Sequence, residues 1–139
     1  MQFSRQNLIT TSGICFLFLI WSGISSGEDF YVPSKTHPTI QSAVDDARDG
    51  DVICIAGGTY YPEKTIDIGA KEITLRGSVD RKGNLNTIID GQDEIRLVQC
   101  SAKQGKRRKE KGSVVLEYLV ITNGYANEGA GLYNNGRNL

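Results

Sequence analysis

Histidine, cysteine and proline are scarce in this chain, and the first two scarcities exclude whole classes of site. Its 139 residues include one histidine, three cysteines and three prolines. Two of the cysteines, Cys54 and Cys100, follow the N-terminal apolar stretch, and two are too few for a structural zinc site. The single histidine, His37, has no serine, cysteine or aspartate around it in a recognisable catalytic arrangement. We therefore expect no catalytic triad, no metal and no cofactor.

The chain also lacks a net charge and a membrane-spanning apolar run. Its 16 basic and 16 acidic residues balance, so no overall charge attracts it to nucleic acid. The apolar run Ile14–Trp21 has eight residues, whereas a spanning helix needs about 20. It lies between a polar stretch carrying Arg5 and the small residues of segment 22–27, as in a secretory signal peptide. The sequence predicts a signal peptide over residues 1–27, with a retained N-terminal anchor as the alternative.

Glycine, by contrast, is abundant at 16 residues, which is typical of short strands joined by tight turns. Only the segment 39–48 has a helical period: Ile40, Ala43, Val44 and Ala47 form one apolar stripe, and Thr39 is a plausible N-cap. After it, short β-type runs recur between breaks that carry Gly or Asn. We expect strands at Val52–Ala56, Thr65–Ile68, Glu72–Arg76, Thr87–Asp90, Ile95–Cys100, Val114–Glu117, Leu119–Thr122 and Leu132–Tyr133.

This pattern excludes a βαβ fold, because no helices separate the strands. It leaves an antiparallel sandwich or a coiled solenoid. Weak hairpin signals and the amphipathic helix before the first strand favour the solenoid, whose terminal coil needs a cover over its apolar cross-section. The alternation in Val52–Ala56 points Ile53 and Ile55 inward, against the stripe of that helix.

Several segments resemble the opening of pectin-lyase-like β-helix proteins. These are TIQSAVDDARDGDVICIAGGTYY, ITLRG, TIIDG and LVITNGYANEGAGLYNN, in this order over residues 39–139. The sequence is most similar to the exported polymorphic outer membrane proteins and their bacterial relatives. The resemblance implies an all-β, right-handed parallel β-helix. In two respects the chain departs from the family: Tyr118 stands at a corner where Gly is usual, and the FxxN repeats are absent. The bulky Tyr118 implies a wider turn or an outward-facing ring.

We expect four segments: the signal peptide at 1–27, an extended lead-in at 28–38, a capping helix at 39–50, and the first coils of a parallel β-helix at 51–139. The β-helix is expected to be incomplete at its C-terminus. A last coil without a cap would leave an unpaired strand edge, so we expect either a fragment or edge-to-edge self-association.

The most basic segment is Lys103–Lys111, with six cations and one acid, whereas the rest of residues 28–139 has nine cations and fifteen acids. A solvated loop explains such a run. The functional alternative is a patch for an anionic polysaccharide or cell-surface polymer. It would be carried by Lys106, Arg107, Arg108, Lys109 and Lys111.

The acidic residues offer weaker candidates. Asp90, Asp93 and Glu94 form a cluster on a turn but do not match a calcium loop. Asp45, Asp46, Asp49 and Asp51 are candidate glycosidase carboxylates by residue type alone. Export would permit a Cys54–Cys100 disulfide, although both cysteines suit buried positions in strands equally well.

No catalytic residue is therefore predicted. The expected function is that of an exported, non-catalytic β-helix segment of a cell-surface or adhesion-like protein, located outside the cell, at its surface or in the periplasm. The alternative is the N-terminal part of a carbohydrate-active β-helix enzyme, a polysaccharide lyase or hydrolase, with its active site in later coils.

Overall fold

The computed structural model describes residues 27–101 and 113–135. Its single helix in these ranges is α2 (Ile40–Asp46). Thr39 is the N-cap and forms a capping box with Ser42, in which each side chain accepts a hydrogen bond from the other's backbone N–H. The apolar stripe expected from the sequence is confirmed, since Ile40, Ala43, Val44 and Ala47 are all buried. At the other end, the Lys71 ammonium donates to the carbonyls of Val44 and Asp45.

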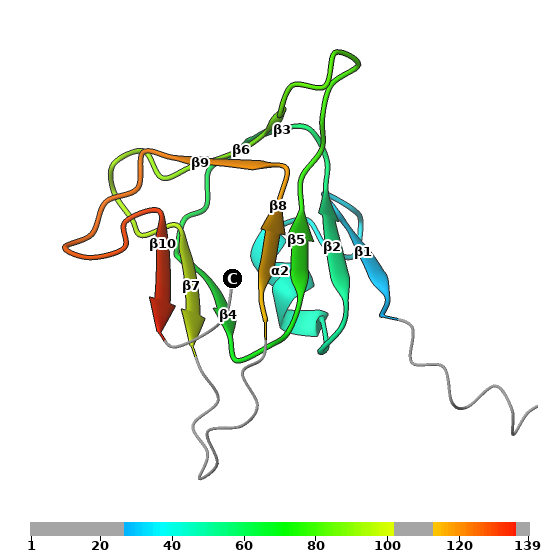
Figure 1. The fold of residues 1–139 in the computed structure, drawn as a ribbon, viewed down its shortest axis with the longest axis horizontal. Coiled ribbons are helices and arrows are strands. Elements are labelled where there is room, and N and C mark those ends of the chain that lie inside the picture. Colours follow the sequence, from blue (N-terminus) through cyan, green and yellow to red (C-terminus); the bar gives the residue numbers. More distant parts are fainter. Residues whose placement is uncertain (1–26, 102–112, 136–139) are drawn as a thin grey trace, which may run out of the picture.

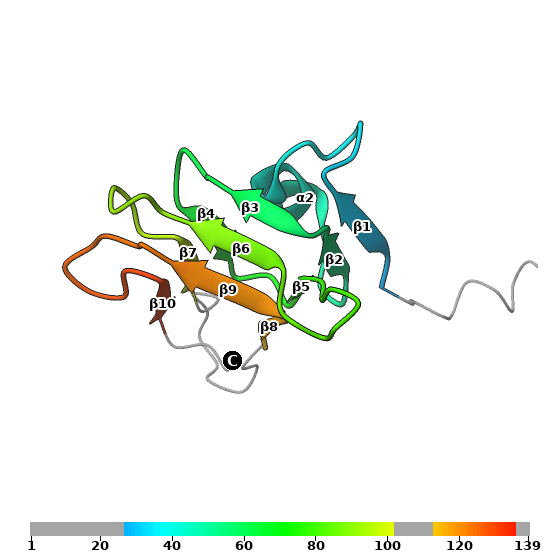
Figure 2. The ribbon, with the colours of Figure 1, turned by 90° about the horizontal axis from the view of Figure 1, so that it is seen from above.

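Ten strands make up the rest of the regular structure in the described ranges, and every pairing between them is parallel. The first sheet holds β1, β2, β5 and β8, the second holds β3, β6 and β9, and the third holds β4, β7 and β10. Figures 1 and 2 show the strands of each sheet side by side. The bounds are β1 Asp29–Val32, β2 Val52–Ile55, β3 Gly58–Tyr60, β4 Ile66–Gly69, β5 Thr74–Arg76, β6 Thr87–Asp90, β7 Val98–Ser101, β8 Val115–Glu117, β9 Leu119–Thr122 and β10 Leu132–Asn135.

From β2 onward the chain visits the three sheets in a fixed rotation. β2, β3 and β4 lie in the first, second and third sheet, and β5, β6 and β7 repeat the sequence, followed by β8, β9 and β10. Each strand is therefore paired with the strand three elements before or after it. The predicted all-β, parallel architecture is confirmed at this level.

The interior between the sheets is filled by aliphatic side chains from all three. Ile53 and Leu75 are paired in register in the first sheet and are both 0% exposed. Ile89 of β6 and Val98 of β7 are likewise fully buried. α2 contacts β1, β2 and β4, so it lies over the end of the interior that the earliest strands form (Figure 1). Burying a Leu or Ile side chain contributes roughly 1.5–3 kcal/mol, so this interior is the main source of stability.

Two strands were missed by the sequence prediction. β1 lies inside the expected lead-in and is extended, but it is paired in register with β2. β3 begins at Gly58, which the sequence marks only as a break between strands. Its pairing with β6 supplies the backbone hydrogen bonds that the local pattern does not reveal. The remaining strands lie within three residues of their expected bounds.

The corner at Tyr118 takes one of the two forms expected. β8 ends at Glu117 and β9 begins at Leu119, so Tyr118 alone makes the turn. Its φ is +57°, a left-handed value that costs a non-glycine residue about 1–2 kcal/mol, and its side chain is 54% exposed. The ring thus faces outward, and the turn is tight rather than wide.

Candidate functional site

Two of the candidate carboxylates hold the backbone after α2. The Asp51 side chain is 6% exposed and accepts hydrogen bonds from the N–H groups of Glu28 and Arg48, at 2.8 and 2.6 Å. Asp49 accepts from the N–H of Glu72 at 2.8 Å. These bonds tie the helix end to the starts of the first-sheet strands. Asp49 and Asp51 therefore have structural roles and do not face each other across a substrate groove.

His37 has a carboxylate partner that the sequence analysis did not identify. Its Nε2 lies 3.1 Å from Oδ2 of Asp46 on α2, and its Nδ1 lies 3.2 Å from the Thr36 hydroxyl. The ring also packs edge-on against Phe30, with 5.1 Å between centroids. The arrangement fastens the segment between β1 and α2 to the helix.

The acidic turn after β6 is held by local hydrogen bonds. Oδ1 of Asp90 accepts from the Gln92 N–H at 2.9 Å and from the Asn123 side-chain amide at 3.0 Å. Gln92 and Asp93 both have positive φ, as in a tight turn. Within residues 27–101 and 113–135, no group of three or more His, Cys, Asp or Glu side chains could hold a metal ion.

The two cysteines occupy opposite faces of their sheets. Cys100 of β7 is fully buried in the interior, whereas Cys54 of β2 lies between the inward-facing Ile53 and Ile55 and points outward. Within the described part of the chain, no disulfide joins Cys54 to Cys100. The Cys54 side chain is on the outer face of its sheet, whereas the Cys100 side chain is in the interior. Burial, followed by the negative charge of Asp29, raises the pKa of the Cys54 thiol, and this favours the protonated form.

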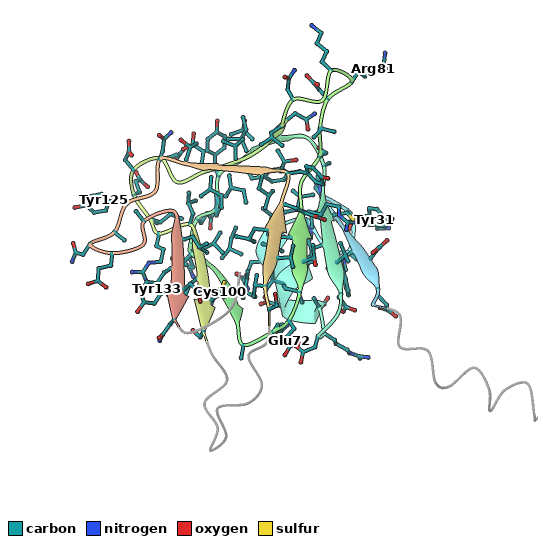
Figure 3. All side chains as sticks on the ribbon, in the orientation of Figure 1. Tyr31, Glu72, Arg81, Cys100, Tyr125 and Tyr133 are labelled. Carbon is teal, nitrogen blue, oxygen red and sulfur yellow. The ribbon has the colours of Figure 1, made fainter. Side chains whose placement is uncertain are left out.

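Cys54 belongs to a row of outward side chains across the first sheet. Tyr31, Cys54, Arg76 and Glu117 are in register on β1, β2, β5 and β8. The Arg76 guanidinium donates through Nε to the Glu117 carboxylate, and this bond with the carboxylate charge raises the pKa of Arg76. Figure 3 shows Tyr31 beside β1, the edge strand of the first sheet. A depression of about 390 Å³ lies along the row.

A larger groove, of about 590 Å³, lies at the end of the molecule that carries α2. One wall is the start of the helix and the residues before it, and the other is β3 with the connection to β4. Because its walls come from segments about 20 residues apart, the sequence gives no local signal for it. It is lined by Pro38, Thr39, Ile40, Gln41, Thr59, Tyr60, Tyr61, Pro62, Glu63, Lys64, Thr65 and Ile66.

The predicted polyanion patch, Lys106, Arg107, Arg108, Lys109 and Lys111, lies outside the described residues. So does almost all of the predicted signal peptide, of which only Gly27 is described. The α2 helix is neither long nor apolar enough to cross a membrane, and it is the only helix in residues 27–101 and 113–135.

No family model, no curated protein and no solved structure matches this chain.

Proposed function

We propose that the chain is an exported segment of a right-handed parallel β-helix that belongs to a non-catalytic, cell-surface or adhesion-like protein. The observation that supports this most is the rotation of successive strands through three parallel sheets. Parallel strands joined by crossovers in one sheet are right-handed in about 98% of cases, which favours a right-handed coil. α2 then acts as the cap of the first coil.

The roles of the acidic side chains support a scaffold function. Asp49 and Asp51 accept backbone N–H groups, and Asp90 fixes a turn. Glu117 is held by Arg76, and Asp46 by His37. Carboxylates engaged in this way stabilise the fold and are poorly placed to act as a general acid and base on one bond.

The end opposite α2 is proposed to take up further strands. β8, β9 and β10 are each the last strand of their sheet within the described residues. Leu116, Leu119, Ile121 and Leu132 on these strands pack against the core but are only partly buried. A strand edge beside apolar side chains favours pairing with another coil or with a second copy of the chain.

We propose an anionic polysaccharide or another anionic surface polymer as the partner of the basic segment. The concentration of six cations within nine residues, on a chain that is otherwise acidic, supports this choice. Attraction between such a segment and a polyanion weakens as salt screens the charges. In this proposal the stacked strands carry the segment, and binding needs no catalytic group.

Replacing Lys106, Arg107, Arg108, Lys109 and Lys111 together by Ser is expected to abolish salt-sensitive retention on an immobilised polygalacturonate column. The wild-type chain should elute later and at higher salt. A variant with Lys35→Ser and Lys82→Ser, two exposed cations elsewhere, serves as the control and should elute near the wild type. Equal retention of the wild type and the five-residue variant would refute the proposed partner. Depolymerisation of the polygalacturonate would instead favour the alternative, a fragment of a carbohydrate-active enzyme.

A further inference from the structure

The 590 Å³ groove beside α2 has the size and the mixed lining of a small-molecule site. Such sites have volumes of roughly 300–1,000 Å³ and combine apolar walls with a few polar groups. Here the exposed Pro38 and the partly exposed Pro62 contribute apolar surface, above the buried Ile40 and Ile66. The hydroxyl of Tyr60 donates to the carbonyl of Ala56 at 3.0 Å, which holds its ring in place. The next residue, Tyr61, also lines the groove and is 57% exposed.

The helix-side wall of the groove is held in place because the Gln41 side chain is hydrogen-bonded to β4. Its side-chain oxygen accepts from the N–H of Asp67 at 2.8 Å, and its side-chain nitrogen donates to the carbonyl of Asp67 at 3.2 Å. The same nitrogen also donates to the Asp45 carboxylate at 2.7 Å. This amide therefore covers part of the edge of β4 in place of another strand. A wall fixed in this way loses little conformational freedom when a ligand binds.

The opposite wall offers one backbone donor and one acceptor. β3 is an edge strand, and its Gly58 N–H bonds to the carbonyl of Asn86 on the β6 side. Because alternate residues of a parallel strand bond to opposite sides, the N–H and C=O of Thr59 point away from β6. β3 has only three residues and is followed shortly by Pro62. That edge is too short to hold a peptide as an added strand, but it suits a ligand carrying hydroxyl groups.

The charges at the groove favour a neutral ligand. Glu63 and Lys64 are adjacent, both are exposed, and both line the groove, so their charges offset each other. An anion or a cation gains little net attraction from such a pair. A pyranose ring with equatorial substituents has hydroxyls around its rim and a flat C–H face. The exposed Tyr61 ring can stack on that face, since an aromatic side chain combines a large apolar surface with a polar tip.

We propose that this groove binds a neutral, β-linked disaccharide unit of a glucose-type glycan. Tyr61 stacks on one sugar ring, the Thr59 backbone exchanges hydrogen bonds with its hydroxyls, and Gln41 holds the facing wall in position. This site is separate from the basic segment and depends neither on export nor on an anionic polymer. The chain would thus carry a contact for neutral glycan at its capped end.

The test is a titration of the full chain with cellobiose, followed by saturation-transfer difference NMR. Saturable binding is expected, and Tyr61→Ala is expected to weaken it about tenfold, whereas Tyr61→Phe should retain it. Tyr31→Ala is the matched control, because Tyr31 is 62% exposed on the outer face of the first sheet, away from the groove. It should bind as the wild type does.

Two further probes test the ligand class. Maltose, whose α-linkage bends the second ring away from a flat platform, should bind more weakly than cellobiose. A digalacturonate should also bind more weakly, with no dependence on salt. The proposal fails if cellobiose shows no transfer at about 20 mM, if Tyr61→Ala and Tyr31→Ala lose binding equally, or if digalacturonate binds more tightly than cellobiose. Circular dichroism of each variant separates loss of the site from loss of folding.

Discussion

Replacing Leu75 by Ala is expected to lower the free energy of unfolding by about 2–5 kcal/mol. Leu75 is 0% exposed on β5, and it is paired in register with Ile53 of β2 and Leu116 of β8. Its side chain therefore lies in the middle of the first sheet's stack. The neighbouring strands on both sides limit how far the surroundings can relax to fill the cavity that the truncation leaves. Because small domains have a total stability of only about 5–15 kcal/mol, the loss should be easily measured by urea denaturation.

Thr74→Ala is the control for this prediction. Thr74 is the neighbour of Leu75 on the same strand and alternates to the outer, half-buried face. We expect it to change the free energy of unfolding by less than about 1 kcal/mol. A loss for Leu75→Ala as small as that of the control would mean that β5 does not present Leu75 to the interior.

Replacing Asp51 by Ala is expected to cost about 2–4 kcal/mol of unfolding free energy. The buried carboxylate accepts two backbone N–H groups, those of Glu28 and Arg48, and its removal leaves both without an acceptor. A hydrogen bond to a charged group contributes about 1.5–3 kcal/mol, and a buried donor without a partner carries its own cost. Denaturation in urea, followed by circular dichroism, gives the measurement.

Two further variants separate the hydrogen bonds of Asp51 from its charge. Asp51→Asn retains one acceptor oxygen and should lose about half as much stability. Asp45→Ala removes an exposed carboxylate that accepts a hydrogen bond from the Gln41 side chain, and it should change stability by less than about 1 kcal/mol. If Asp51→Ala were as stable as Asp45→Ala, the contacts between the helix end and the first sheet would not be structural.

The sequence was informative where structure follows from a local period. The stripe of α2, the Thr39 cap and the alternation of Ile53 and Ile55 are all visible within a few residues. Each reflects a side-chain pattern that repeats at 3.6 or 2.0 positions along the chain. The parallel pairing of the strands was expected from the same patterns together with the family resemblance.

The features that the sequence did not reveal depend on contacts between distant segments. β3 has no apolar alternation of its own, and its hydrogen bonds come from β6, about 30 residues later. His37 lies within hydrogen-bonding distance of Asp46 only because the segment before α2 folds back on the helix. The groove needs both Gln41 and Tyr61, which no spacing rule connects.

The proposed function and the proposed glycan groove assign different surfaces to different partners. The basic segment would take an anionic polymer through salt-sensitive attraction, and the groove at the capped end would take a neutral sugar through stacking and hydrogen bonds. A surface protein with both would hold mixed polysaccharide at two points, and two linked weak contacts bind more tightly than either alone. Loss of one contact should leave the other measurable, so the two proposals can fail independently.

The most direct test of the account is the register between β2 and β5, measured by disulfide formation between outward-facing positions. In the parallel register, Cys54 faces Arg76, and Val52 faces Thr74. Arg76→Cys should therefore form a disulfide with Cys54, and Val52→Cys with Thr74→Cys should do so in a Cys54→Ser background. The crossed pairs, 54 with 74 and 52 with 76, lie more than about 7 Å apart in this register and should not form. High yields for the crossed pairs and low yields for the aligned ones would show antiparallel strands and contradict the parallel architecture.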